Sequence, residues 1–259
     1  MKTKKIILTF LLAIPTFILS ATITYAQSRK GYEIMKKNDQ LKEPSDAYSE
    51  GTLILTDKRG NQKQRKMKMY TRKRDEGYDS FFEILSPADV AGMKFLTLAR
   101  KGDDEQRMYL PAMGKSRKIA SSGKDGKFLG SDIYFYDLED HDLDDFTYKY
   151  LKNETWNGKE YYVVEAYPGN EDAPYSKLVN WVRVDNYYVY KMEMYDKKQN
   201  RLLKTMKITE TSIMQGIILT IRMEVINHLE NSKTLYSQTK NKINIGLSED
   251  IFTVRNLEN

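Results

Sequence analysis

The run YKMEMYDKKQNRLLKTMKITETSIMQGIILTIRMEV, residues 190–225, decides the fold because apolar and charged residues alternate along it. Near its start, Met192 and Met194 alternate with lysine and glutamate, and near its end the apolar positions are Leu219, Ile221, Met223 and Val225. A period of two places the apolar side chains on one face of a strand. Turn-forming residues separate the alternating segments. The run therefore predicts consecutive antiparallel strands with one dry face and one wet face.

The same pattern continues outward on both sides of this run. Residues 52–56 and 62–71 predict a hairpin closed by the turn at residues 57–61, and Trp156-Asn157-Gly158-Lys159 is the clearest hairpin signal, because Asn-Gly tolerates positive φ angles. We expect about ten long strands, and a sheet of that size twists and curls toward a barrel. One helix is predicted over Arg29 to Leu41. The fold class is mainly β with few helices, α+β.

The N-terminal segment has the pattern of a signal peptide. Met1 to Lys5 is basic, Ile6 to Leu19 is apolar, and Thr24-Tyr25-Ala26 places small residues where a signal peptidase reads them. We expect residues 1–26 to be a signal peptide cleaved before Gln27, and residues 27–259 to form a single domain exported to the periplasm. The alternative is a retained membrane anchor, for which the apolar run is short.

Composition excludes several classes of protein. The chain has no cysteine, which excludes a disulfide scaffold, a thiol nucleophile, a cysteine-ligated metal and a cysteine-anchored lipoprotein. Three of the 42 basic residues precede residue 27, and the remaining 39 exceed the 36 acidic residues by only three. That excess is too small to indicate a nucleic-acid partner.

One stretch, Ser121 to Phe146, differs from the strands around it. It contains glycine and serine near its start, yet it also carries Phe128, Leu129, Ile133 and Phe135. We interpret it as a flexible apolar lid over the dry face of the curled sheet, with an ordinary core plug as the equal alternative.

Four runs together resemble a known family. They are SPADVAGMKFL (residues 86–96), MYLPAMGKSRKI (108–119), FLGSDIYFYDLE (128–139) and LSEDIFTVRNL (247–257), in that order. The chain is similar in these runs to the periplasmic outer-membrane lipoprotein-sorting family, relatives of the LolA and LolB lipoprotein carriers. The resemblance implies a strongly curved antiparallel sheet forming an incomplete, half β-barrel, capped by a helix and a lid loop, with a hydrophobic cavity.

The resemblance also implies a function. Such carriers hold acyl chains of lipoproteins or lipids without covalent chemistry and shuttle them toward the outer membrane. An inner-membrane transporter and an outer-membrane acceptor are the implied partners, and we expect a monomer. The known carriers hold their lid with an arginine near the end of an early strand; Arg72 and Arg74 lie in a comparable region, but their surroundings do not match closely enough to transfer that role.

Apolar residues on the dry face are the expected cavity lining, and methionine is common among them because its unbranched side chain adapts to varied cargo. The predicted lining is Met67, Met69, Phe82, Ile84, Met108, Leu110, Val164, Val182, Met192, Met194, Met206, Leu219, Ile221 and Met223. The predicted lid contacts are Phe128, Leu129, Ile133 and Phe135. For any single methionine, simple core filling is the alternative.

Enzymatic signals are lacking, so we expect no catalysis and no cofactor or metal. His141 and His228 are far apart in sequence, and no nucleophile elbow or phosphate-binding glycine loop occurs. The acidic run at residues 137–145 lacks the spacing of a calcium loop and is interpreted as a solvated connector. A cell-envelope binding or scaffold module without lipid cargo is the alternative function.

Two further motifs have structural interpretations. The basic run at residues 63–74 is expected to guard its strand against edge pairing, with contact to anionic headgroups as the alternative. In SPADVAG, Ser86 is expected to cap a short helical turn that Gly92 ends.

Overall fold

The computed structural model of the chain describes residues 15–259. Residues 1–14, which hold the basic start and much of the apolar run of the predicted signal peptide, lie outside the described residues. The helices are α1 (Pro15–Asp39) and α2 (Val254–Glu258). The strands are β1 (Asp46–Thr56), β2 (Gln62–Arg74), β3 (Gly77–Ser86), β4 (Lys94–Leu98), β5 (Glu105–Leu110), β6 (Lys115–Lys118), β7 (Phe146–Trp156), β8 (Lys159–Pro168), β9 (Tyr175–Arg183), β10 (Val189–Asp196), β11 (Leu202–Met214), β12 (Ile217–Asn227) and β13 (Ser232–Ile243).

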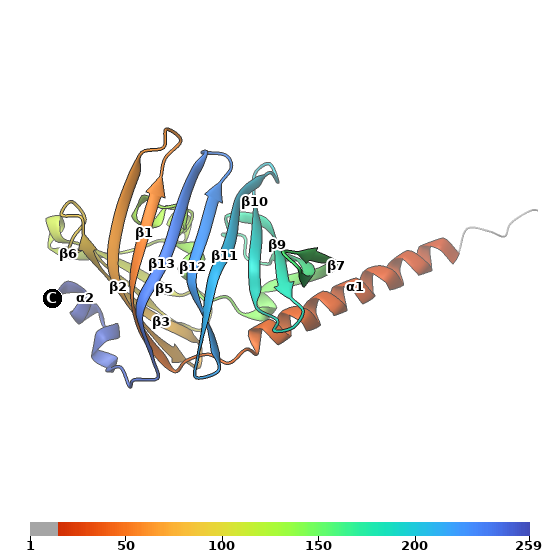
Figure 1. Ribbon diagram of the computed structural model, residues 1–259, viewed down its shortest axis with the longest axis horizontal. Helices are drawn as coiled ribbons and strands as arrows, with labels where there is room; N and C mark the ends of the chain where they lie inside the picture. The colour runs from red at the N-terminus through yellow and green to blue at the C-terminus, as the bar shows by residue number, and fades with distance from the viewer. Residues whose placement is uncertain (1–14) are drawn as a thin grey trace, which may run out of the picture.

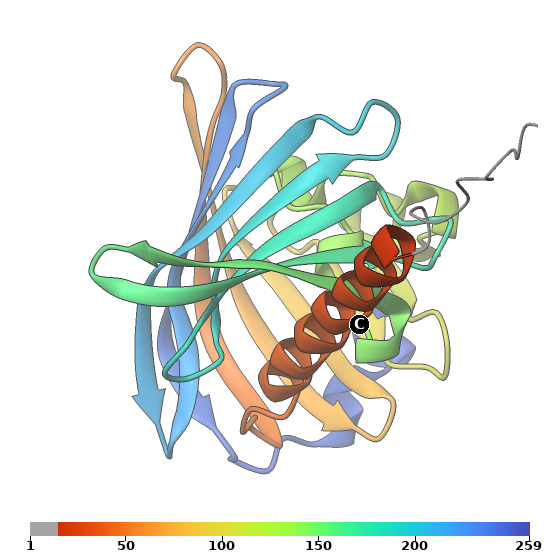
Figure 2. The same cartoon turned by 90° about the vertical axis from the view of Figure 1, so that its right-hand side faces the viewer.

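All thirteen strands form one antiparallel sheet in the order β6-β5-β4-β3-β2-β1-β13-β12-β11-β10-β9-β8-β7. Figure 1 shows the central strands side by side, and Figure 2 shows the curvature of the whole sheet. The sheet is not closed, because β6 and β7 are its two edges and do not pair with each other. The prediction of a mainly β, curled and unclosed antiparallel sheet is confirmed.

The predicted hairpin turns form as their sequences indicate. Asn157 and Gly158 both have positive φ, 50° and 69°, and Trp156 pairs with Lys159 across the turn. Gln215 and Gly216 join β11 to β12 in the same way, with φ of 53° and 77°. Such turns match the twist of the strands that they connect.

Several elements differ from the prediction. The sheet has thirteen strands because β4, β6 and β13 were not expected as strands, and α1 already includes residues from Pro15, upstream of the predicted start at Arg29. Residues 87–92 form a short helical turn, in which the Ala91 N–H donates to the Pro87 carbonyl at 2.9 Å and which Gly92 ends with φ of 77°, but Ser86 is the last residue of β3. The prediction that the basic run at residues 63–74 guards its strand against edge pairing is wrong, because β2 is an interior strand that pairs with β1 and β3.

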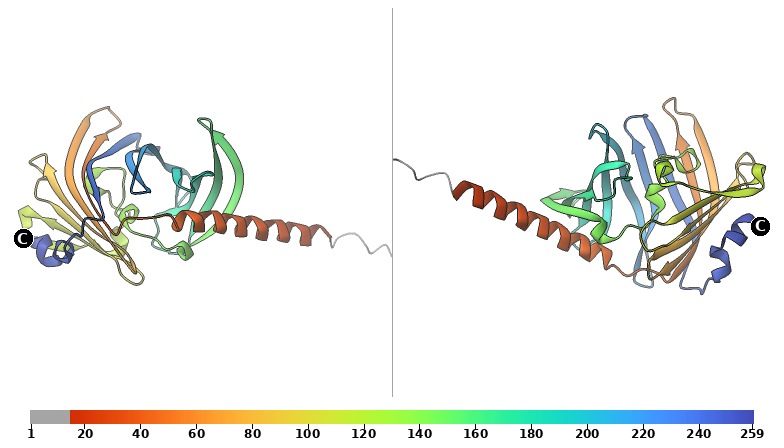
Figure 3. Two further views of the ribbon diagram at one scale, coloured as in Figure 1. Left: turned by 60° about the horizontal axis from the view of Figure 1, so that its bottom comes forward. Right: turned by 180° about the vertical axis from the view of Figure 1, so that it is seen from behind.

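The concave face of the sheet carries most of the core. One apolar cluster joins α1 to β7–β11, and a second joins β1–β4 to residues of the segment between β6 and β7. Figure 3 (left) shows this segment, residues 119–145, inside the arch of the sheet. The C-terminal elements cover the opposite, convex face of β3 and β4 through Phe252 and Leu257.

Helix α1 packs closely on the edge strand β7. A Cβ at Gly31 would lie 2.8 Å from the backbone nitrogen of Tyr150, so only glycine allows the helix to approach the strand this closely. Ile34 of the same helix is buried in the concave cluster. The N-terminal part of α1 extends away from the sheet (Figure 1). Among the described residues, no helix combines the length and the apolar character needed to cross a membrane.

Candidate functional site

A pocket of about 350 Å³ lies between the concave face of the sheet and the segment from β6 to β7. Six methionines line it together with leucine, valine and aromatic side chains. The lining residues are Leu53, Met67, Met69, Phe82, Phe128, Ile133, Tyr136, Asp137, Leu138, His141, Tyr175, Leu178, Met192, Met194, Met206, Met223, Val225 and Tyr236. We call this space the methionine pocket.

The register of the strand pairs places lining residues of neighbouring strands opposite each other. Met192 of β10 lies opposite Met206 of β11, which lies opposite Val225 of β12. Likewise, Met69 of β2 lies opposite Phe82 of β3. Because paired residues of an antiparallel sheet share a face, the alternating sequence becomes a continuous apolar surface.

Glycine makes room for two of the methionines. Gly51 lies opposite Met67 in the pairing of β1 with β2. A Cβ at Gly51 would stand 3.1 Å from Cε of Met69 and 3.3 Å from Cγ of Met67. The missing side chain therefore sets the space that both thioethers occupy.

Aromatic rings hold the loop side of the pocket against the sheet. The ring of Phe128 lies 5.7 Å from that of Phe82 and 5.5 Å from that of Phe95, both in edge-to-face contact. Phe135 stacks on Phe95 at 5.6 Å. Such pairs are favourable beyond the area that they bury. The loop is thus packed onto the sheet, not suspended above it.

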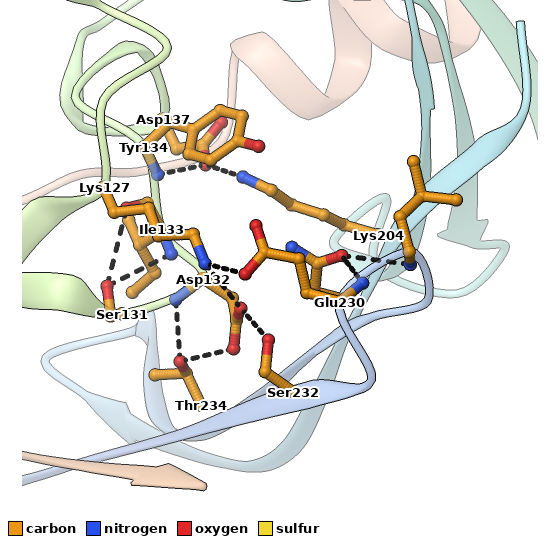
Figure 4. A network of polar contacts seen from close by, with 12 residues as sticks. Lys127, Ser131, Asp132, Ile133, Tyr134, Asp137, Lys204, Glu230, Ser232 and Thr234 are labelled. Atoms are coloured by element: carbon orange, nitrogen blue, oxygen red, sulfur yellow. Dashed lines mark hydrogen bonds and ion pairs between the residues drawn. The ribbon is translucent and has the colours of Figure 1, made fainter. Parts of the chain in front are cut away.

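A buried lysine ties the same loop to β11 (Figure 4). The side chain of Lys204 is 0% exposed, its Nζ lies 3.3 Å from the Asp137 carboxylate, and it donates a hydrogen bond of 3.0 Å to the Tyr175 hydroxyl. The same Nζ lies 2.9 Å from the centre of the Tyr134 ring. Burial lowers the pKa of Lys204 to about 8, and the negative charge of Asp137 opposes that shift.

A second polar anchor lies on β13. The buried Asp132 carboxylate accepts hydrogen bonds from Ser232 (2.5 Å) and Thr234 (2.9 Å), and the Asp132 backbone N–H donates to the Thr234 hydroxyl at 2.8 Å (Figure 4). Lys127, just before this point, pairs with Glu230. Loop residues 127–137 are therefore held by both apolar packing and desolvated polar contacts.

A larger hollow opens beside the methionine pocket. Its volume is about 790 Å³, and it lies between the C-terminal end of α1, the β2–β3 and β11–β12 turns, residues 140–143 and strands β7–β10. We call it the polar chamber, because eight charged side chains line it. Leu178, Met192 and His141 line both spaces, so the two are adjacent.

Comparisons with known proteins agree with this architecture. A family model with the description "Uncharacterized protein" matches residues 76–259. A solved outer membrane lipoprotein-sorting protein domain from Vibrio parahaemolyticus is 27% identical with a TM-score of 0.85, covering 90% of this chain and 100% of that one. A DUF1329 family protein from Desulfovibrio piger is 29% identical with a TM-score of 0.85, covering 89% and 99%. The chain belongs to the family of that model, and in sequence and fold it is similar to the outer membrane lipoprotein-sorting domain and to the DUF1329 family protein.

A more distant neighbour supports the fold alone. A LolA superfamily protein from Nitrosomonas europaea is 20% identical with a TM-score of 0.69, covering 86% of this chain and 97% of that one. No protein of curated function matches the sequence.

The arginines considered for the lid do not contact the loop between β6 and β7. Arg72 pairs with Glu249 near the C-terminus, and Arg74 pairs with Asp79 at 2.7 Å. The cation that contacts the loop beside the pocket is Lys204. Sequence analysis missed Lys204 because a lysine in an alternating strand normally indicates the wet face.

Half of the predicted lining residues border the methionine pocket: Met67, Met69, Phe82, Met192, Met194, Met206 and Met223. Ile84, Met108, Val164 and Val182 instead pack within the apolar clusters, and Leu219 lines the polar chamber. Leu110 and Ile221 are partly buried and border neither space. Of the predicted lid contacts, Phe128 and Ile133 border the pocket, while Leu129 and Phe135 pack beside it.

The pocket also has lining residues that were not predicted. Leu53 lies in the alternating part of β1, so its position was visible in the sequence, whereas Leu178 begins a run of consecutive buried residues in β9 that has no alternation. Tyr236 comes from β13, whose polar sequence hid the strand. Its hydroxyl lies 3.5 Å from the sulfur of Met69, and burial raises its pKa.

The acidic run is only partly a solvated connector. The Glu139 carboxylate is buried and pairs with the buried Lys124 at 2.9 Å, whereas Asp137 is partly exposed and pairs with the buried Lys204. The two histidines form hydrogen bonds with different residues. His141 Nε2 is 3.2 Å from the carbonyl of Tyr136, and His228 Nε2 is 2.8 Å from the Thr205 hydroxyl. Within residues 15–259, no cluster of three or more histidine, aspartate or glutamate side chains has metal-binding geometry.

Proposed function

We propose that this protein is a periplasmic carrier that binds an acyl chain of a lipoprotein or lipid in the methionine pocket and shuttles it toward the outer membrane. The observation that carries the proposal is an apolar pocket of about 350 Å³ with six methionines in its wall. Methionine side chains repack easily, which suits cargo of differing length. Similarity over 90% of the chain to an outer membrane lipoprotein-sorting protein domain supports the same function.

The pocket has the capacity for one acyl chain. An apolar protein cavity of about 150 Å³ holds the six carbons of benzene, or about 25 Å³ per carbon. The methionine pocket of about 350 Å³ therefore takes about 14 carbons. At about 0.8 kcal/mol per buried CH₂, such a chain gains about 11 kcal/mol before the costs of association are subtracted.

Release requires that much of this gain be offset. In this proposal the loop between β6 and β7 is the lid, and opening it breaks the aromatic contacts of Phe128 and the contacts of Lys204 and Asp132 with their partners. Helix α1 caps the far arm of the sheet through its packing on β7. A carrier with these opposing terms can accept cargo from an inner-membrane transporter and pass it to an outer-membrane acceptor.

The test is uptake of a fluorescent fatty acid by the purified protein. Replacing the buried Met194 by aspartate (Met194→Asp) should abolish uptake, while Met194→Leu should retain it, because only the first change places a charge in the pocket wall. Met223→Phe provides a second variant that fills the pocket without adding a charge. Circular dichroism checks the fold of each variant, and unchanged uptake by folded Met194→Asp and Met223→Phe proteins would refute the proposal.

Native mass spectrometry gives independent evidence. Protein purified from a membrane-containing host should carry acyl material, and the Met223→Phe variant should carry less. The alternative, an envelope scaffold module without cargo, expects a filled interior and no bound lipid.

A further inference from the structure

Basic residues are concentrated at one margin of the sheet, which we call the basic rim. Three segments form it: residues 57–66 at the tip of the β1–β2 hairpin, the turn at residues 87–92 after β3, and residues 111–118 of the β5–β6 turn and β6. These segments contain eight basic and two acidic residues, a net charge of +6. Residues 27–259 carry a net charge of only +3, so the remainder of that range is net negative.

Contacts between the segments keep the basic rim together. Lys66 of β2 lies opposite Ser86, the last residue of β3. A Cβ at Gly92 would lie 3.2 Å from Cγ of Pro111, so the turn after β3 touches the β5–β6 turn. The part of β2 that precedes Lys66 has no partner on β3, so the tip of the β1–β2 hairpin projects beyond β3 (Figure 1).

The two acidic groups do not neutralise the rim. The Asp57 carboxylate lies within the hairpin turn and accepts hydrogen bonds from the backbone N–H groups of Arg59 at 2.8 Å and Asn61 at 3.0 Å. Asp89 lies 3.9 Å from Arg65, which is buried. Among the described residues, the other seven cations of the rim are exposed and have no carboxylate within ion-pair distance: Lys58, Arg59, Lys63, Lys66, Lys115, Arg117 and Lys118. The rim therefore presents positive charge to solvent.

The form of the rim favours a broad anionic surface as its partner. None of the seven exposed cations lines the methionine pocket or the polar chamber, so they do not enclose a small anion there. Two exposed apolar side chains lie among them: Leu85, 39% exposed, precedes Ser86, and Met113, 36% exposed, lies two residues before Lys115. Cations interspersed with apolar side chains match the interface of an anionic bilayer, where headgroups attract the charges and apolar groups reach the acyl boundary. An acidic protein surface would match the charges alone.

The rim is continuous with the loop that covers the methionine pocket. Ile119 directly follows β6, donates its backbone N–H to the Gln106 carbonyl at 2.9 Å and packs in the second apolar cluster. The side chain of Gln106 in turn donates to the carbonyl of Phe135 at 2.9 Å. A surface that holds β6 therefore lies next to the start of this loop.

We propose that the basic rim docks the protein on the surface of a bilayer that carries anionic phospholipid headgroups. The docking goes beyond the proposed carrier function, because it gives the protein a membrane contact of its own. It does not depend on whether the methionine pocket is filled.

Flotation with lipid vesicles tests the docking. Protein purified from the periplasm of an expressing host is mixed with vesicles of phosphatidylcholine alone, or of phosphatidylcholine with phosphatidylglycerol. It should float with the anionic vesicles and not with the neutral ones. High salt should abolish binding, because the Debye length is only about 10 Å at 0.1 M salt and shortens further as salt is added.

Two triple variants assign the binding to the rim. Each lysine or arginine held at an anionic bilayer surface contributes about fivefold to binding, so the loss of three should weaken it about tenfold or more. The rim variants are Lys58→Gln/Arg59→Gln/Lys63→Gln and Lys115→Gln/Arg117→Gln/Lys118→Gln. The matched control removes three exposed cations outside the rim, and the same net charge, and should bind within about twofold of wild type: Lys159→Gln/Lys198→Gln/Lys242→Gln.

The outcomes are decisive for the docking and separate it from the carrier function. Absence of binding to anionic vesicles, or an equal loss in the control and the rim variants, would overturn the docking proposal. Binding to soluble poly-glutamate without binding to vesicles would also overturn it, in favour of an acidic protein partner. Circular dichroism checks the fold of each variant. Uptake of the fluorescent fatty acid should be unchanged in both rim variants, and Met223→Phe should float like wild type, so either proposal can fail while the other stands.

Discussion

The ion pair between the buried Lys204 and the partly exposed Asp137 allows a quantitative prediction. The substitution Asp137→Asn removes the negative charge 3.3 Å from the ammonium and keeps the shape of the side chain. A buried pair broken in this way typically costs about 3–5 kcal/mol, because a charge is left without a partner. Lys204 can escape part of that cost by losing its proton.

The pKa of Lys204 sets how large the cost becomes. With a pKa of about 8 in the folded protein, the ammonium is favoured over the neutral amine by about 1.4 kcal/mol at pH 7. If Asp137→Asn moves the pKa of Lys204 below the pH of the experiment, Lys204 is a neutral amine in the folded state. The electrostatic loss should then be about 1.4 kcal/mol at pH 7, about 2.7 kcal/mol at pH 6 and close to zero at pH 9.

The sign follows from proton linkage. Lys204 has a lowered pKa in the folded state, so the unfolded chain holds more protons above pH 8 and stability rises with pH there. In Asp137→Asn this rise should begin at a lower pH, which makes the difference from wild type shrink as pH increases.

Urea unfolding at several pH values measures the effect. Asp137→Asn should lower the free energy of unfolding more at pH 6 than at pH 9, and in a Lys204→Met background the same substitution should have a small effect without pH dependence. Asp125→Asn, an exposed carboxylate of the same loop, is the control and should change stability by no more than about 0.5 kcal/mol. A loss for Asp137→Asn that is equal at pH 6 and pH 9 would refute the reasoning.

Three further predictions concern Asp104, which lies just before β5, the pocket and the loop between β6 and β7. Burial raises the pKa of Asp104 to about 6 and that of Glu139 to about 7, so both groups should lower wild-type stability as pH rises from about 4 to about 6, and Asp104→Asn should reduce this fall in thermal melts recorded across that range. Gly51→Ala should keep the fold, because its Cβ meets the flexible end of Met69 at 3.1 Å, but should reduce uptake of the fluorescent fatty acid; full uptake would show that Gly51 does not set the pocket volume. Cysteines at Asp132 and Thr234, whose side chains are in hydrogen-bond contact, should form a disulfide that blocks loading until reductant is added, and loading by the oxidised protein would argue against a lid.

The strands were predictable from local sequence, with exceptions that have a physical reason. Alternation along β10–β12 and the Asn157-Gly158 turn depend only on residues within a few positions of each other. Strands β6 and β13 lack that pattern, and they form because they pair with β5 and β1.

The candidate site was predictable only in part. Alternation places Met67, Met192 and Val182 alike on the concave face, yet Met67 and Met192 border the pocket and Val182 packs within a cluster. The difference depends on what covers each residue. Sequence periodicity reports the face of a strand and carries no information about the element packed above it.

For this protein, sequence alone determined the β architecture, the dry and wet faces and the abundance of methionine on the dry face, because each follows from short-range periodicity and composition. The tertiary structure decided that β1 pairs with β13, that a lysine on β11 is buried against an aspartate 67 residues away, and that an apolar pocket borders a polar chamber. These features arise from contacts between distant segments, where desolvation and packing depend on partners that no local pattern specifies.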